Sequence, residues 1–247
     1  MNIIKNELFK ISDKAEEEIE IITVGDRKSK VCRVHNVFEY PDDVYNFITT
    51  HPVELNNSWD ADFYYEGPLS PHYTPGYTGL INVEARPLRR FMNWVLSQHF
   101  LEKRYFKTLT RINAFKGGTI GPKRACWPHA DLESDYSGTF YLDKKNLGGT
   151  AFYRFKNELE EYLATKWYTP TFQEYLNWES HWSMKGSCEF DPVDNDENWE
   201  MIHLEPVSWN KAVIYEAKLF HNVYVKPEMY QDDFRTSINV FTHGPKI

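Results

Sequence analysis

The sequence is poor in cysteine and has no long uninterrupted run of apolar residues. Its three cysteines, Cys32, Cys126 and Cys188, are widely spaced and odd in number, which argues against a disulfide framework. No apolar stretch approaches the ~18 residues that a membrane-spanning helix needs, and the first residues lack the apolar core of a signal peptide. We therefore expect a cytoplasmic protein without membrane segments.

Basic residues are also in deficit, because 28 Lys and Arg face 36 Asp and Glu, giving a formal net charge of -8. This charge disfavours nucleic acid as a partner, since its phosphates would be repelled overall. The charge is uneven, however. Residues 103–124 contain seven basic residues and no acidic one, whereas residues 189–205 are strongly acidic. Both segments are consistent either with solvated surface or with the oppositely charged rims of a cleft.

Aromatic residues are abundant, at 16% of the 247 residues. Bulky rings suit the space between packed sheets, so this loading favours a β-rich core. The length is sufficient for one large domain, and we treat residues 1–247 as a single domain. Within it, residues 1–106 are expected to form N-terminal strands and supporting helices, and residues 107–242 the main β core.

The N-terminal part alternates strand and helix signals. Residues 15–24 and 29–40 are predicted strands around a GDRKS turn, and residues 41–51 a helix. Residues 86–103 are a second predicted helix, because their apolar residues recur at three- and four-residue spacing. Residues 52–86, rich in proline, glycine and aromatic rings, are interpreted as an ordered loop.

From residue 107 the apolar period changes to two, which predicts a series of short strands. They span residues 107–115, 136–143, 150–155, 199–205, 211–217, 221–226 and 235–243. An insert, residues 156–197, interrupts them and carries many aromatic rings. Its length favours either a lid over a site or a cover for a sheet face. The predicted class is α+β, mainly β, with flanking N-terminal helices.

The segment WPHADLES contains His129 and Asp131, two residues apart. On an extended segment both side chains point the same way, and His221, at the start of a later strand, is the candidate third ligand. Two imidazoles and one carboxylate on one face of a metal suit Fe(II) and leave positions free for substrates. His203 and Glu205 have the same spacing and form a competing pair.

The predicted strand 235–243 also carries an unusual pattern. Arg235, Ser237 and Asn239 share one face, whereas Ile238 and Val240 share the other. A polar face directed inward is explained if the interior is a binding cavity and helices cover the outside. An arginine beside a hydroxyl is suited to holding a carboxylate by charge-assisted hydrogen bonds.

Four segments, PHAD, GTFYLDKKNLGGTAFYR, KAVIYEAKLFHNVYV and RTSINVF, carry a family resemblance. Together they resemble the iron(II)- and 2-oxoglutarate-dependent oxygenases. More narrowly, they are similar to an uncharacterised bacterial and phage branch related to prolyl-hydroxylase-like enzymes. The resemblance covers about residues 107–242 and implies a double-stranded β-helix, that is, a jelly-roll or cupin-like core.

The resemblance implies that His129, Asp131 and His221 hold Fe(II), with 2-oxoglutarate and O2 as cosubstrates. It further implies that Arg235 holds the distal carboxylate of 2-oxoglutarate. Three residues are implied as further contacts of the cosubstrate: Ser237, Tyr141 and Asn113. Because the carboxylate ligand Asp131 leaves no coordination position for a halide, hydroxylation is favoured over halogenation.

The expected activity is therefore hydroxylation of an amino acid, a peptide or protein side chain, or a small metabolite. Two alternatives stay open. The basic run 103–124 would suit a nucleobase-oxidising dioxygenase, and the same fold could belong to a non-catalytic jelly-roll binding protein. The sequence does not indicate an oligomeric state.

Overall fold

The computed structural model describes residues 6–50, 77–83, 85–116, 128–131, 134–156, 161, 199–226, 229 and 234–243. Most of the predicted 52–86 loop therefore lies outside the described residues. The insert 156–197 also lies outside them, apart from Lys156 and Glu161. The prediction that this insert is a lid or a sheet cover therefore concerns residues that the structure does not describe. Within the described ranges, none of the helices is long and apolar enough to cross a membrane.

The N-terminal half contains strands and helices in alternation, as expected. Its elements are the 3-10 helices η1 (Asn6–Phe9) and η2 (Asp13–Glu16), strands β1 (Ile19–Val24) and β2 (Ser29–Val34), helix α1 (Pro41–Thr50), strand β3 (Tyr77–Val83) and helix α3 (Arg86–His99). Two predictions need correction. Residues 77–83 are a strand rather than loop, because they pair with the next strand, and the first predicted strand starts only at Ile19.

All seven strands predicted after residue 107 are present. They are β4 (Lys107–Lys116), β5 (Tyr136–Tyr141), β6 (Gly149–Phe155), β7 (Trp199–Pro206), β8 (Lys211–Glu216), β9 (His221–Tyr224) and β10 (Phe234–His243). The described part of the chain is therefore mainly β, with antiparallel pairing throughout.

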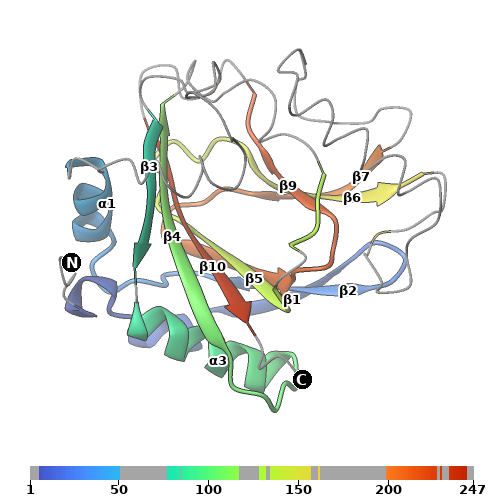
Figure 1. Cartoon of the computed structure of the whole chain (residues 1–247), viewed down its shortest axis with the longest axis horizontal. Coiled ribbons are helices and arrows are strands. Elements are labelled where there is room, and N and C mark those ends of the chain that lie inside the picture. The colour runs from blue at the N-terminus through green and yellow to red at the C-terminus, as the bar shows by residue number, and fades with distance from the viewer. Residues whose placement is uncertain are drawn as a thin grey trace, which may run out of the picture.

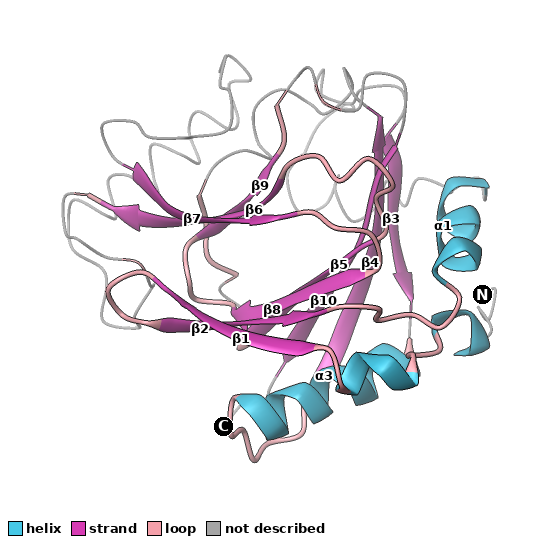
Figure 2. Cartoon of the chain, turned by 180° about the vertical axis from the view of Figure 1, so that it is seen from behind, coloured by secondary structure: helices cyan, strands magenta, loops and turns pink. Residues whose placement is uncertain are grey.

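The strands form two sheets (Figure 1). The larger has seven strands in the order β1-β2-β8-β5-β10-β4-β3, and the smaller has three in the order β7-β6-β9. Strands from the N-terminal part thus join the same sheet as strands from the C-terminal part. Figures 1 and 2 show the smaller sheet opposite the larger one, so two inner faces look toward each other.

Helix α3 covers the outer face of the larger sheet (Figure 2). Its apolar stripe, including Leu88, Met92 and Val95, is buried against outward-facing residues of the sheet. Those residues are Cys32, Val34, Ile112, Phe140, Ala212, Ile214, Ile238 and Val240. Burial of this stripe is what an amphipathic helix requires for its stability, and it leaves the inner face of the sheet free for other contacts.

A second core lies between the two sheets. It is formed by buried apolar and aromatic residues from both of them, among them Val31, Tyr141, Phe152, Val213 and Tyr215. Because side chains alternate along a strand, the same strands that supply this inner core also present polar residues further along. Those polar residues surround the cavity described next.

Candidate metal centre

Backbone pairing brings the His-x-Asp segment against strand β9. His129 and His221 form an isolated antiparallel bridge, in which each backbone N–H donates to the other residue's carbonyl at 2.9 Å. The Asp131 N–H donates to the carbonyl of Ala217 at 2.9 Å. Residues almost a hundred positions apart in sequence are thereby held as neighbours, and the two histidine rings lie 4.7 Å apart.

The three side chains converge on one point. Each of His129, Asp131 and His221 offers a ligand atom, and these atoms lie within 4.8 Å of one another. Asp131 Oδ2 is 3.3 Å from His221 Nε2, and Oδ1 is 3.9 Å from His129 Nε2. His221 is buried, whereas the His129 side chain is 47% exposed. The cluster is therefore closed on the protein side and open on the other.

The His221 ring is oriented by a backbone contact. Its Nδ1 lies 2.7 Å from the carbonyl oxygen of Leu219. Since a carbonyl only accepts hydrogen bonds, Nδ1 carries a proton, and Nε2 is the ring nitrogen that faces Asp131. Metal-ligating histidines are commonly oriented by such a contact from the second ring nitrogen. The Tyr215 ring packs edge-on against the imidazole, with centroids 4.8 Å apart.

Asp131 is held as a carboxylate. Burial raises its pKa, but His221, His129 and the Ser137 hydroxyl oppose this, and the pKa ends below its usual range. Ser137 Oγ donates to Asp131 Oδ2 at 2.6 Å. The remaining oxygen, Oδ1, faces His129. A partly buried carboxylate flanked by two imidazoles provides a suitable site for a divalent cation.

A cavity of about 210 Å³ adjoins this cluster. Along β10 it is lined by Arg235, Ser237, Asn239 and Phe241, whereas Ile238 and Val240 belong to the outer core. This matches the polar-inward alternation expected for the strand. The other lining residues are His129, Asp131, Ser137, Gly138, Thr139, Thr150, Tyr215, His221, Asn222 and Val223.

Arg235 is buried, and no carboxylate in the described part of the chain offsets its charge. The residue is 4% exposed, and its Nε has no hydrogen-bond partner. Within the ranges that the structure covers, no carboxylate forms an ion pair with it; its guanidinium carbon lies 5.9 Å from the centre of the Tyr141 ring. A buried, uncompensated cation is costly. The arrangement is explained if an anion enters the cavity.

The remaining predicted contacts differ in position. The Tyr141 hydroxyl is hydrogen-bonded to Thr150 Oγ1, and burial raises the Tyr141 pKa to about 12, against the opposing effects of Arg235 and Thr150. Tyr141 is thus a neutral neighbour of Arg235. Asn113 pairs with Ser237 in the β4–β10 register, but its side chain lies outside the described part of the chain.

The competing pair is engaged elsewhere. Glu205 is fully buried and accepts hydrogen bonds from Arg33 Nε at 2.8 and 3.0 Å, from Lys211 Nζ and from His203 Nε2 at 3.0 Å. Both carboxylate oxygens are therefore occupied by cations or donors. No third metal-ligating side chain joins this pair among the described residues.

Sequence reasoning missed several polar residues of the cavity. Ser137, Thr139 and Tyr215 are examples, and Thr150 links the cavity to Tyr141. The period of two was the available signal, because Ser137 and Thr139 share a face with Tyr141 on β5. The partner strand of each residue, however, could not be read from the sequence.

Comparison with known proteins shows the family of this chain. A family model matches residues 15–241, and the chain belongs to that family, which is described as a family of unknown function (DUF6445). A search of curated proteins finds no match.

Several solved structures are distantly similar. IDO from Bacillus thuringiensis is 12% identical with a TM-score of 0.34, over 64% of this chain and 56% of that one. This chain therefore spans little more than half the length of that protein. An oxidoreductase of the 2OG-Fe(II) oxygenase family from Burkholderia pseudomallei is 10% identical with a TM-score of 0.33, over 91% and 72%. A prolyl-4-hydroxylase from Pseudomonas putida is 11% identical with a TM-score of 0.30, over 76% and 82%. Likenesses this weak establish neither the fold nor the chemistry of this chain.

Proposed function

We propose that this protein is an Fe(II)- and 2-oxoglutarate-dependent dioxygenase that hydroxylates an amino acid, a peptide or protein side chain, or a small metabolite. In this proposal residues 1–247 form one cytoplasmic domain. Its two facing antiparallel sheets are a double-stranded β-helix, with the cavity between them as the active site.

One observation carries the proposal. A cluster of two imidazoles and a carboxylate opens onto the same cavity as a buried arginine that pairs with no carboxylate of the described ranges. The cluster is suited to binding a cation, and the arginine is suited to binding an anion. A molecule that chelates a metal at one end and carries a carboxylate at the other satisfies both, and 2-oxoglutarate is such a molecule.

The residues fit the metal that the proposal requires. His129, Asp131 and His221 would supply three ligands, a number typical of non-haem Fe(II) oxygenases, which keep the remaining positions open. Fe(II) so bound would supply the oxidative decarboxylation of 2-oxoglutarate to succinate, coupled to substrate hydroxylation. The protein supplies orientation: Leu219 sets the His221 ring through its carbonyl, and Ser137 steadies Asp131.

The residues also fit the cosubstrate. Arg235 and Ser237 stand two positions apart on the inner face of β10, where a guanidinium and a hydroxyl can hold one carboxylate together. The cavity, at about 210 Å³, is smaller than the ~300–1,000 Å³ typical of drug-sized ligands. Its size therefore suits a small dicarboxylate beside the metal and leaves the primary substrate near the open side, at His129.

The test is an anaerobic titration of the purified protein with Fe(II) and 2-oxoglutarate. A weak visible charge-transfer band is expected only when both are present, followed by succinate formation on admission of air. Absence of the band would contradict the proposal. A band without succinate under any substrate would favour the non-catalytic binding protein.

The choice of substrate is tested in the same assay. Amino acids and peptides are expected to raise succinate formation above the uncoupled rate. Stimulation by single-stranded DNA or RNA instead would favour the nucleobase-oxidising alternative.

A further inference from the structure

The peptide group between Leu219 and Phe220 is engaged at both ends. Its carbonyl accepts from His221 Nδ1 at 2.7 Å, and its N–H donates to the backbone carbonyl of Glu161 at 2.9 Å. A peptide group is planar and rigid, so the direction of its N–H fixes the direction of its carbonyl. The Glu161 carbonyl thus fixes the N–H side of this peptide group, and the carbonyl side of the same group orients the His221 ring.

Glu161 is itself fixed by its carboxylate. The residue is 1% exposed, and its oxygens accept from the backbone N–H groups of Asp26 at 2.8 Å and Arg27 at 3.1 Å. Arg154 donates to Oε1 through Nε at 3.2 Å and through a terminal nitrogen at 3.0 Å. A buried carboxylate with four charge-assisted or backbone hydrogen bonds has little freedom to move.

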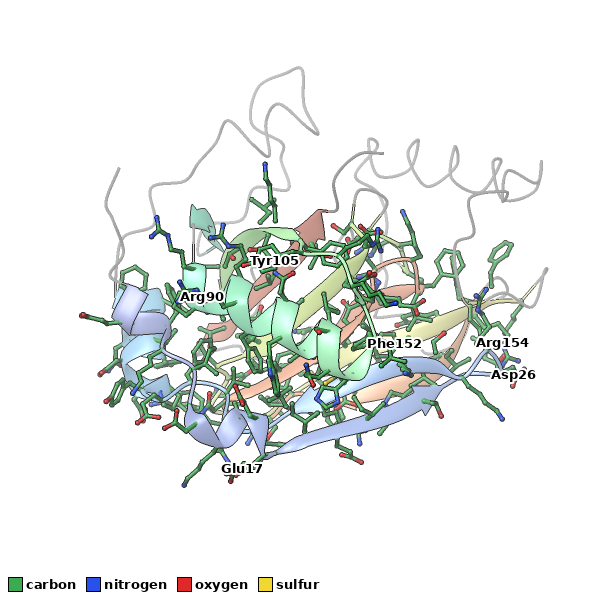
Figure 3. The ribbon with its side chains drawn as sticks, turned by 90° about the horizontal axis from the view of Figure 1, so that it is seen from below. Glu17, Asp26, Arg90, Tyr105, Phe152 and Arg154 are labelled. Atoms are coloured by element: carbon green, nitrogen blue, oxygen red, sulfur yellow. The ribbon has the colours of Figure 1, made fainter. Side chains whose placement is uncertain are left out.

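The turn between β1 and β2 is shaped to receive this carboxylate. Gly25 has a φ of 65°, which favours glycine, and a Cβ added there would overlap the Glu161 carboxylate. Arg154 also pairs with Asp26 at 3.0 Å, and both are labelled together at one end of the hairpin in Figure 3. The first hairpin of the chain is thereby connected, through Glu161, to the segment that carries His221.

We propose that Glu161 is a positioning residue for the metal centre, which acts on His221 through the Leu219–Phe220 peptide. The inference rests on the proposed function in that His221 is taken as a metal ligand. The hydrogen bond from Phe220 N–H to Glu161 also polarises the Leu219 carbonyl, which strengthens its bond to the imidazole. Release of Glu161 is therefore expected to loosen the ring and to weaken metal binding.

The first measurement is the affinity for Co(II). Metal-free protein is titrated with Co(II), and binding is monitored by the visible absorption of the bound ion. Glu161→Ala is expected to weaken Co(II) binding by roughly tenfold, the low end for loss of an outer contact to a metal ligand. Glu161→Gln keeps one of the two acceptor oxygens that the turn uses and should lie between wild type and Glu161→Ala. Glu205→Ala is the matched control, because it removes an equally buried carboxylate whose hydrogen bonds go to Arg33, Lys211 and His203 rather than to the 219–221 segment.

The second measurement uses the metal-free protein at neutral pH. Long-range 1H–15N NMR should show the His221 Nδ1–H hydrogen bond to Leu219 in wild type and in Glu205→Ala, and a weakened Nδ1–H hydrogen bond in Glu161→Ala. An unchanged Nδ1–H signal, with Co(II) affinity equal to that of Glu205→Ala, would overturn the inference. If wild type binds no Co(II), the proposed function fails, whereas the NMR comparison still tests the contact from Glu161 to His221.

Discussion

Two pairs in this chain, His129 with Asp131 and His203 with Glu205, have the same residue spacing and opposite environments. In the first pair the carboxylate faces two imidazoles and a serine hydroxyl, beside a cavity. In the second the carboxylate is fully buried among a lysine, an arginine and a histidine. A two-residue motif is thus not sufficient to define a metal site.

The difference arises from the strands across from each pair. Strands β2 and β8 bring Arg33 and Lys211 to Glu205, so its charge is neutralised within the protein. Strand β9 brings His221 to Asp131, and no lysine or arginine of the described ranges pairs with that carboxylate, so its charge is available to a cation. A site for a metal requires ligands whose charge the protein has not already satisfied.

The largest effect is expected from a substitution that removes the carboxylate of the first pair. Asp131→Ala should abolish Co(II) or Fe(II) binding and 2-oxoglutarate turnover, because it removes the anionic ligand of the cluster that the described residues form. Metal affinity, measured by titration of metal-free protein, is the readout. His203→Ala is the control and should leave affinity nearly unchanged; loss of binding in that variant would reverse the ranking of the two pairs.

An intermediate effect concerns the stability that Glu205 contributes. Burial raises the Glu205 pKa, but hydrogen bonds from His203, Arg33 and Lys211 outweigh this and lower it from 4.5 to about 2. A folded-state pKa below the unfolded value stabilises the protein above pH 4.5, and this stabilisation is lost as pH falls toward 2. Glu205→Gln should thus lower the free energy of unfolding at pH 7 by about 3 kcal/mol.

Chemical denaturation across pH tests this expectation. The stability difference between wild type and Glu205→Gln should shrink steadily between pH 4.5 and 2. A difference that does not change with pH would mean that packing, rather than the charge of Glu205, accounts for the loss.

The smallest effect is expected from a substitution in the cavity beside the first pair, and it tests whether Arg235 binds 2-oxoglutarate. Arg235→Lys keeps the positive charge but loses the planar fork of the guanidinium, so the Michaelis constant for 2-oxoglutarate should rise roughly tenfold, about 1.4 kcal/mol. Co(II) affinity in the absence of 2-oxoglutarate should not change. Unchanged saturation by 2-oxoglutarate would indicate that its distal carboxylate is held elsewhere.

Local periodicity was enough to predict most of the regular structure. The three- and four-residue spacing of Leu88 to Leu96 specified the buried face of α3, and the period of two specified the strands after residue 107. It also specified which residues of β10 face inward, since alternation depends only on the extended backbone. The prediction for residues 77–83 failed because their strand is stabilised by pairing with β4, a contact outside the local pattern.

Charge compensation, in contrast, depended on which strands lie side by side. Nothing near Glu205 in the sequence indicates that Arg33, more than 150 residues earlier, neutralises it across the sheets. Likewise, nothing near Arg235 indicates that no described carboxylate pairs with it, or that Glu161 contacts the peptide group that orients the His221 ring. Alternation along one strand is a local property, whereas the electrostatic environment of a side chain is set by strand order and by the packing of one sheet on the other.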